Sequence, residues 1–238
     1  MNKIPYITTD QMREVDRLMI GHFRVGLGQM MENAGRNLAE LARKDFFAGN
    51  TNNKKVLVLV GTGGNGGGGL VASRHLHNQG AEVTVVLATS KYRLAKIPRR
   101  QLDILEEIGI EIVNLPNTPD FTAFDLIIDA LIGYSLKGNP EDEYASLIIA
   151  ANSHNKPILS LDTPSGLDTT TGETFEPCIK ADATMTLALP KTGFQEEDAK
   201  EYIGKLYLAD IGVPPELYKM MELDVPRELF SEGYIVEV

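Results

Sequence analysis

The pattern of hydrophobic and polar positions changes at about residue 55, from helical spacing to an alternation of strands and helices. Before that point, Thr8-Thr9-Asp10-Gln11 has the spacing of a capping box, which predicts a helix from about Thr9 to Ile20. Apolar residues then recur at steps of four and three through 27–41, which marks the buried face of a second helix. Two helices are therefore expected before the first strand.

From Lys55 onwards, short apolar runs alternate with longer segments of helical character. Runs such as Leu126-Ile127-Ile128 and Pro157-Ile158-Leu159 are too continuously apolar for a sheet with one face in water. The sequence therefore predicts an α/β fold with a mostly parallel sheet and helices on both of its faces. The predicted strands cover 55–60, 82–88, 110–115, 124–132, 157–162, 182–189 and 205–210, and the predicted helices between them cover 67–79, 99–108 and 141–153.

Composition narrows the class of protein without changing this pattern. The 238 residues, 43% of them hydrophobic, predict a single domain over 1–238. A net charge of −10 with no basic cluster argues against nucleic-acid binding. The single cysteine, Cys178, allows no internal disulfide, and no apolar leader or membrane span is visible. A cytoplasmic protein is expected, or a mitochondrial one if a transit peptide has been removed.

The segment Gly61–Gly69 is the strongest local signal, with seven glycines in nine positions between a predicted strand and a predicted helix. This order is typical of a nucleotide-phosphate site, where bare backbone N–H groups hold an anion at a helix N-terminus. A Walker-type loop is excluded because no Gly-Lys-Ser/Thr closes the run. An NAD-dependent dehydrogenase would carry an acidic residue after the next strand, where Ala88–Arg93 stands instead. Lys91 and Arg93 either meet a phosphate or remain solvated.

Two aspartates, Asp129 and Asp162, each follow an apolar strand and precede a tight turn. Ligands of open α/β sheets sit outside the carboxyl ends of the strands, so both carboxylates are expected at one edge of the sheet. Asp129 would meet a metal ion, a lysine or a substrate hydroxyl, or would shape the turn by accepting backbone N–H bonds. With Asn65 and Ser165 it makes an all-oxygen set that suits a monovalent cation. Asp162 is then free for proton transfer.

Five motifs occur in an order that is specific to one family. They are Met31-Glu32-Asn33-Ala34-Gly35-Arg36, the glycine segment with Leu70–Leu76, Asp129–Gly133, Asp162–Gly166 and Leu189-Pro190-Lys191. Over nearly the whole chain, this order resembles the YjeF N-terminal domain family, whose enzymes are NAD(P)H-hydrate epimerases. Lys191 is a weaker candidate for a catalytic role than Asp162. It is equally compatible with a charged side chain at the rim of the site.

The resemblance implies a three-layer Rossmann-like fold and a homodimer. It implies an isomerase that interconverts the R and S forms of hydrated NADH and NADPH (NADHX and NADPHX), so that a separate dehydratase repairs the S form. It also implies one potassium ion, bound by Asn65, Asp129 and Ser165, with Asp162 as the catalytic residue. The substrate-binding residues carried over by position are Gly64, Asn65, Gly66, Gly67, Gly68, Gly133, Tyr134, Ser135, Leu136, Lys137, Gly138, Asn139 and Asp162.

The chain departs from the family pattern in the glycine segment. Members of the family usually read Asn-Asn-Gly-Gly-Asp-Gly where this chain has Gly64-Asn65-Gly66-Gly67-Gly68-Gly69. An amide at position 64 and a carboxylate at position 68 are therefore absent. Two interpretations remain open: an active epimerase, or a weakened or inactive relative that acts as a nucleotide-binding or scaffold protein.

Overall fold

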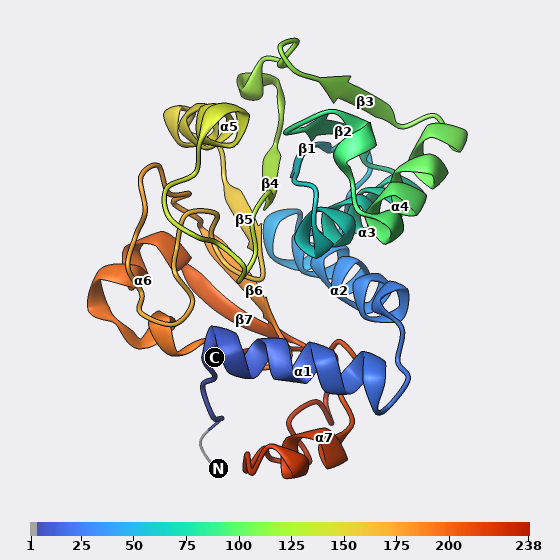
Figure 1. Ribbon diagram of the computed structural model, residues 1–238. Helices are drawn as coiled ribbons and strands as arrows, with labels where there is room; N and C mark the ends of the chain where they lie inside the picture. Colours follow the sequence, from blue (N-terminus) through green and yellow to red (C-terminus); the bar gives the residue numbers. More distant parts are fainter. Residues whose placement is uncertain (1–3) are drawn as a thin grey trace.

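The computed structural model describes residues 4–238, which build one eight-stranded sheet in the order β3-β2-β1-β4-β5-β6-β7-β8 (Figure 1). Strands β1 to β7 run parallel to their neighbours, and β8 pairs antiparallel with β7. The predicted, mostly parallel α/β fold is confirmed. The strands are β1 (Lys55–Val60), β2 (Glu82–Leu87), β3 (Glu111–Asn114), β4 (Leu126–Ala130), β5 (Ile158–Leu161), β6 (Ala183–Leu187), β7 (Lys205–Ala209) and β8 (Ile235–Glu237).

Helices cover both faces of the sheet, and strand β1 shows why. Val56, Val58 and Val60 are buried in one core together with residues of α2, α3 and α4, whereas Leu57 and Leu59 pack into a second core with α5. The α-helices are α1 (Thr9–Gly21), α2 (Leu27–Leu41), α3 (Gly64–Asn78), α4 (Lys96–Glu107), α5 (Asp142–Ser153), α6 (Glu197–Ile203) and α7 (Pro215–Met220). The short helical turns are η1 (Ala42–Phe46), η2 (Lys91–Arg93), η3 (Phe121–Ala123) and η4 (Thr192–Gln195).

The first helix begins where its sequence predicts. Thr8 and Gln11 form the expected capping box at the start of α1, and α2 has the predicted bounds. The sequence pattern missed α6, α7 and β8, because each is short and α7 lies in a segment that Pro214 and Pro215 made to look irregular. Proline suits the first turn of a helix, where its missing N–H costs nothing, and Pro215 occupies that position. No helix within residues 4–238 has the length and apolar character needed to cross a membrane.

The glycine segment is largely helix rather than loop, since α3 begins at Gly64 and not at residue 67. A Cβ atom at Gly66 would lie 1.9 Å from the carbonyl oxygen of Gly61, and one at Gly69 would lie 2.5 Å from Cβ of Ala130. At Gly67 a Cβ would meet the Met31 side chain at 2.5 Å. These glycines let α3 pack closely on the sheet and on α2, and this packing outweighs their poor helix propensity.

Candidate functional site

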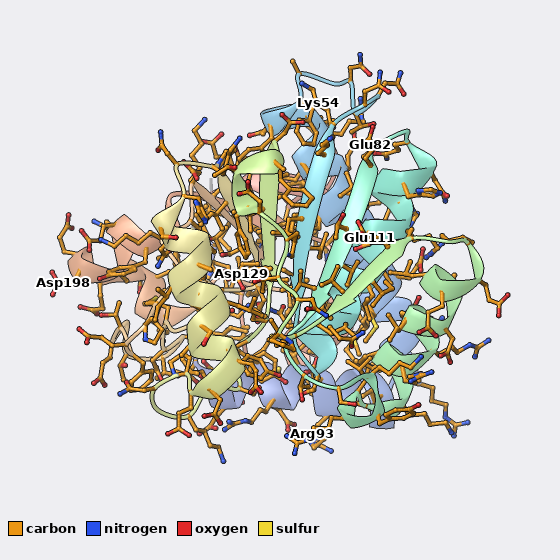
Figure 2. The ribbon with its side chains drawn as sticks, turned by 90° about the horizontal axis from the view of Figure 1, so that it is seen from above. Lys54, Glu82, Arg93, Glu111, Asp129 and Asp198 are labelled. Carbon is orange, nitrogen blue, oxygen red and sulfur yellow. The ribbon has the colours of Figure 1, made fainter. Side chains whose placement is uncertain are left out.

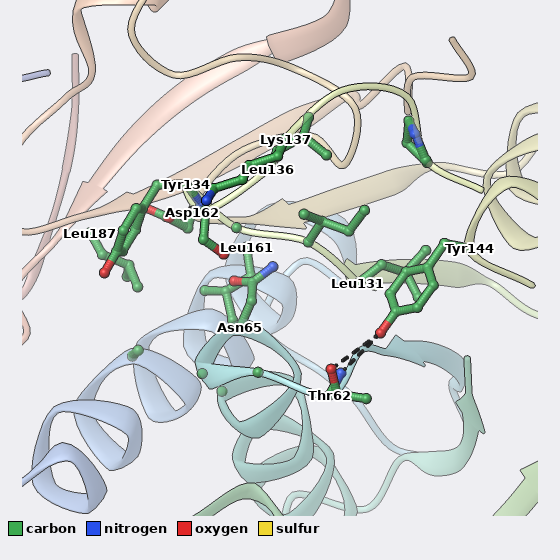
Figure 3. Close-up of a pocket in the computed structure, with 18 of the residues that line it drawn as sticks. Thr62, Asn65, Leu131, Tyr134, Leu136, Lys137, Tyr144, Leu161, Asp162 and Leu187 are labelled. Carbon is green, nitrogen blue, oxygen red and sulfur yellow. Dashed lines mark hydrogen bonds between the residues drawn. The ribbon is translucent and has the colours of Figure 1, made fainter. Parts of the chain in front are cut away.

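A cleft of about 1090 Å³ lies at the carboxyl ends of the strands, where the chain order switches between β1 and β4 (Figure 3). Its walls come from α1, α2, the start of α3, residues 131–144 and the end of β5. Ligands of open α/β sheets bind at this kind of switch point. The cleft brings together eleven of the sequence-predicted site residues, namely Gly64, Asn65, Gly68, Gly133, Tyr134, Ser135, Leu136, Lys137, Gly138, Asn139 and Asp162.

Four predicted site residues do not line the cleft. Gly66 and Gly67 are turned toward Gly61 and Met31 by their positions in α3. Their expected contact with substrate therefore has no support in the geometry, because the segment is helical where a loop was expected. Asp129 and Ser165 lie beneath the cleft, fully buried.

Asp162 directly follows β5 in a left-handed backbone conformation, with φ of +65°, and its side chain is 5% exposed. Such a conformation is uncommon for a residue with a side chain and is concentrated at functional sites. Oδ1 of Asp162 accepts a hydrogen bond from Nζ of Lys191 at 2.8 Å, and Oδ2 accepts one from the backbone N–H of Tyr134 at 3.2 Å. The carboxylate is therefore fixed at the cleft wall by a cation and a backbone donor.

Lys191 is fully buried, so it is not a charge at the rim. Besides Asp162, its ammonium donates to Oγ1 of Thr186 and to the carbonyl oxygen of Leu187, each at 2.9 Å. All three protons of the ammonium have an acceptor, as a buried cation requires. The sequence signal was its place in the loop after β6, the strand that pairs with β5, but one sequence could not distinguish this lysine from a solvated one.

Asp129 is the fourth residue of β4, and its two oxygens accept four hydrogen bonds. The donors are the backbone N–H groups of Leu131 and Ser165 and the hydroxyls of Ser160 and Ser165, at 2.6–3.2 Å. Burial raises the pKa of the Asp129 carboxyl above its usual range, while these hydrogen bonds act in the opposite direction. A nearby cation would stabilise its ionised form.

Asn65 carries a buried polar group without a protein partner. Neither its amide oxygen nor its amide nitrogen has a hydrogen-bond partner within residues 4–238, although both atoms are buried. Figure 3 shows this amide facing the region of Asp162, and a Cβ placed on Gly133 would lie 3.2 Å from Oδ2 of Asp162 and 3.4 Å from Cβ of Asn65. Unpaired buried amides are rare, so this one indicates a ligand between α3 and the loop after β4.

The loop after β4 connects the surroundings of Asn65 with those of Asp129. Ser165 joins the Asp129 network to the loop after β4, because its Oγ accepts from the backbone N–H of Ile132 at 2.8 Å. No group of three or more His, Cys, Asp or Glu side chains within residues 4–238 is arranged to hold a metal ion. One carboxylate, an unpaired amide oxygen and a hydroxyl suit a weakly charged hard cation better than calcium or zinc.

The start of α3 offers backbone donors to an anion. Its N-cap is Gly63, which provides no side-chain acceptor for the first N–H groups of the helix. A Cβ at Gly63 or Gly64 would meet nothing within 4 Å, so both residues face open space. An exposed helix N-terminus lined by glycine is suited to hold a phosphate group. At Gly68, by contrast, a Cβ would approach Cδ2 of Leu161 to 2.6 Å.

Helix α1 contributes a side chain that the sequence analysis did not single out. Asp16 lines the cleft, and its Oδ2 accepts a hydrogen bond from the hydroxyl of Tyr134 at 2.5 Å. Burial raises the pKa of Asp16 above its usual range, and the hydrogen bond from Tyr134 partly opposes this. The signal in the sequence is that Asp16 is four residues from buried Met12 and three from buried Met19, on the inward face of α1.

The fold and the site define a Rossmann-like α/β protein with its cleft at the switch point of a parallel sheet. The model of the family described as YjeF-related protein N-terminus matches residues 27–193, and the chain belongs to this family. The resemblance read from the five sequence motifs is therefore confirmed.

Named relatives cover almost the whole chain. The NAD(P)H-hydrate epimerase of Dehalogenimonas lykanthroporepellens is 44% identical over 98% of this chain and 92% of its own length. The one from Rhodopirellula baltica is 34% identical over 93% of this chain and 90% of its own. The bifunctional NAD(P)H-hydrate repair enzyme of Moorella thermoacetica is 35% identical over 89% of this chain, which is 41% of that enzyme.

A solved structure supports the fold. The crystal structure of the yeast protein YNL200c superimposes with a TM-score of 0.83 over 99% of this chain and 100% of that one. At 22% identity, this likeness concerns the fold alone.

Proposed function

We propose that this protein is an epimerase of hydrated NAD(P)H, an isomerase that acts in nicotinamide nucleotide repair. The observation that carries the proposal is the buried Asp162–Lys191 pair, held at the wall of a cleft of dinucleotide size. Relatives named NAD(P)H-hydrate epimerase match nearly the full chain at up to 44% identity. Phosphates of the substrate would lie at the start of α3, with the hydrated ring toward Asp162.

The reaction needs a group that both gives and takes a proton. In the hydrated ring, a hydroxyl sits on the carbon next to the ring nitrogen. Asp162 delivers a proton to this hydroxyl, the C–O bond breaks, and the lone pair of the ring nitrogen forms a C=N bond as water leaves. Water then adds to the other face of the carbon and returns a proton to Asp162. Lys191, 2.8 Å from Oδ1 of Asp162, keeps its own protons and stabilises the carboxylate that exists between these two steps.

A potassium ion is proposed at Asn65, Asp129 and Ser165. The unpaired amide of Asn65 and the fully buried carboxylate of Asp129 are the observations that favour it. When bound, the ion would supply positive charge near the substrate phosphates. Thermal unfolding in KCl and in tetramethylammonium chloride at equal ionic strength tests this: we expect KCl to raise Tm in the wild type, and Asn65→Ala to remove the difference. Equal Tm values in the two salts would contradict the site.

The other expectations from the sequence remain proposals. A homodimer, the single domain over 1–238 and a cytoplasmic location, or a mitochondrial one, rest on the resemblance and on composition. The functional partner would be an NAD(P)HX dehydratase. The relatives named as bifunctional repair enzymes, in which this chain matches only part of the length, support that pairing.

The deciding experiment is conversion of a pure epimer. Incubating the protein with R-NADHX and following the S form by chromatography should show a rate well above the spontaneous one. Asp198→Asn, an exposed carboxylate in the first turn of α6, serves as a control that keeps the activity. A wild-type rate equal to the spontaneous one would leave only the interpretation of an inactive nucleotide-binding or scaffold protein.

A further inference from the structure

A second cavity, of about 580 Å³, lies at the end of β2, next to the main cleft. The two share the residues Thr89, Arg93 and Glu143, so they are continuous. Residues 88–93 line the second cavity, and two residues further on Ala95 donates its backbone N–H to the carbonyl oxygen of Thr62, beside the start of α3, at 3.1 Å. The proposed reaction uses none of these residues.

In the proposed orientation, the hydrated ring of the dinucleotide lies at Asp162 and its phosphates lie at the start of α3. The binding site of the adenosine half then remains to be identified. On the other side of the switch point, β1 is followed in the sheet by β2. The part of the cleft that the ring and the phosphates leave open therefore lies at the carboxyl end of β2. In Rossmann-type sheets the residue at this position reads the adenosine ribose: an acidic residue binds its 2′-hydroxyl, and an arginine accommodates a 2′-phosphate. Here β2 ends at Leu87 and is followed by Ala88-Thr89-Ser90, without a carboxylate.

Arg93 is the cation at this position that remains free to bind an anion. Lys91 pairs with Glu106 at 2.7 Å, and Arg99 pairs with Asp103 at 2.7 Å. Arg93, in contrast, forms no salt bridge with any residue in 4–238, and it is exposed at the edge where the strands end (Figure 2). Its neighbour Tyr92, which is 84% exposed, lines the cavity with an aromatic ring, and the guanidinium of Arg99 lies 5.8 Å from the centroid of this ring.

We infer that the second cavity binds the adenosine half of the substrate and that Arg93 selects its 2′-phosphate, so that the protein prefers NADPHX to NADHX. Guanidinium binds phosphate through paired, charge-assisted hydrogen bonds, which are stronger than neutral ones. Glu143, exposed and lining both cavities, would repel a phosphate there, so binding depends on Arg93. This inference rests on the proposed function for its orientation of the substrate.

The test compares the two substrates in the wild type and in Arg93→Gln. We expect wild-type kcat/KM to be about tenfold or more higher for NADPHX, as one charged phosphate contact would give. Arg93→Gln should reduce this ratio to about one, mainly through KM for NADPHX. The matched control is Arg100→Gln, an exposed arginine on α4 that lines neither cavity and should leave the ratio unchanged. The inference would be overturned if the wild type had equal kcat/KM for the two substrates, or if Arg93→Gln lowered kcat/KM equally for both.

A binding measurement separates this inference from the proposed reaction. Calorimetric titration with adenosine 2′,5′-bisphosphate and with adenosine 5′-monophosphate requires no turnover. The bisphosphate should bind at least about tenfold more tightly to the wild type, and Arg93→Gln should remove this difference. Preferential binding of the bisphosphate without epimerisation would support the subsite and refute the epimerase. Epimerisation without this binding preference would support the epimerase and refute the subsite.

Discussion

Two aspartates end neighbouring parallel strands, and their surroundings differ. Asp129, at the end of β4, is fully buried and accepts four hydrogen bonds from uncharged donors. Asp162, after β5, faces the cleft and is held by the ammonium of Lys191 and one backbone N–H. The first arrangement fixes the loops that follow the strands, and the second keeps a carboxylate available to a substrate. The same residue type thus has different surroundings at the ends of two neighbouring strands.

The largest expected effect is on catalysis by Asp162→Asn. Removing the carboxyl group proposed to transfer the proton should lower kcat by about 100- to 10,000-fold, the usual contribution of general acid–base catalysis. The measurement is the rate of R-to-S conversion, with circular dichroism to check that the variant is folded. Activity within a few-fold of the wild type would mean that Asp162 does not transfer the proton and that the comparison is wrong.

Lys191→Met breaks the same pair from the other side and acts on stability. It leaves the carboxylate of Asp162 buried without its cation, which should cost about 3–5 kcal/mol in the free energy of unfolding. Urea titration measures this. The double variant with Asp162→Asn should recover part of the loss, because no unpaired charge then remains. If the single variant unfolds at the wild-type urea concentration, the pair does not support the fold.

Ser165→Ala tests the region of Asp129 in the same way. It removes a hydroxyl that donates to Asp129 and accepts from the backbone N–H of Ile132. We expect a loss of about 1–3 kcal/mol in the free energy of unfolding, because the buried Asp129 carboxylate loses one of its four donors and the backbone N–H of Ile132 loses its acceptor. Ser146→Ala is the control and should change little, because this serine is exposed and its hydroxyl donates to the carbonyl oxygen of Asp142. Equal effects of the two substitutions would show that the Asp129 network is not important for stability.

The smallest expected effect concerns pH and Asp16. Its pKa is raised in the folded protein by burial, so the folded state holds this proton more tightly than the unfolded one. The associated stability is present below the unfolded pKa of about 3.8 and is lost as pH rises through the folded pKa. Asp16→Asn should therefore gain stability relative to the wild type as pH increases across that window. Urea midpoints of both proteins from pH 3.5 to about 7 measure this, and parallel curves would contradict it.

The parts of the site that the sequence could predict are those fixed by strand ends. Continuous apolar runs locate β4 and β5, and the residues that follow them must reach the same edge of a parallel sheet. Asp129, Asp162 and Ser165 could be selected on this basis, and Asn65 by the same argument applied to the end of β1. The structure places all four at or beneath the cleft.

The remaining parts depend on contacts between distant segments. The burial of Lys191 depends on Asp162 and Thr186, and the role of Asp16 depends on the approach of Tyr134. The glycines were interpreted as a phosphate loop, whereas most of them allow close packing of α3. A single sequence does not reveal which atoms a missing Cβ would meet.

The backbone beside Lys191 has a consequence for the order of folding. Ile7 donates its N–H to the carbonyl oxygen of Pro190 at 2.8 Å, and its own carbonyl oxygen accepts from Thr192 at 3.0 Å. The backbone of Lys191 is thus held by a residue near the N-terminus, far away in the sequence, and closing so long a loop is entropically costly. Contacts of this kind tend to form slowly during folding. On refolding, helices should return before activity does, since the surroundings of the Asp162–Lys191 pair are complete only when the segment around Ile7 has met the loop after β6.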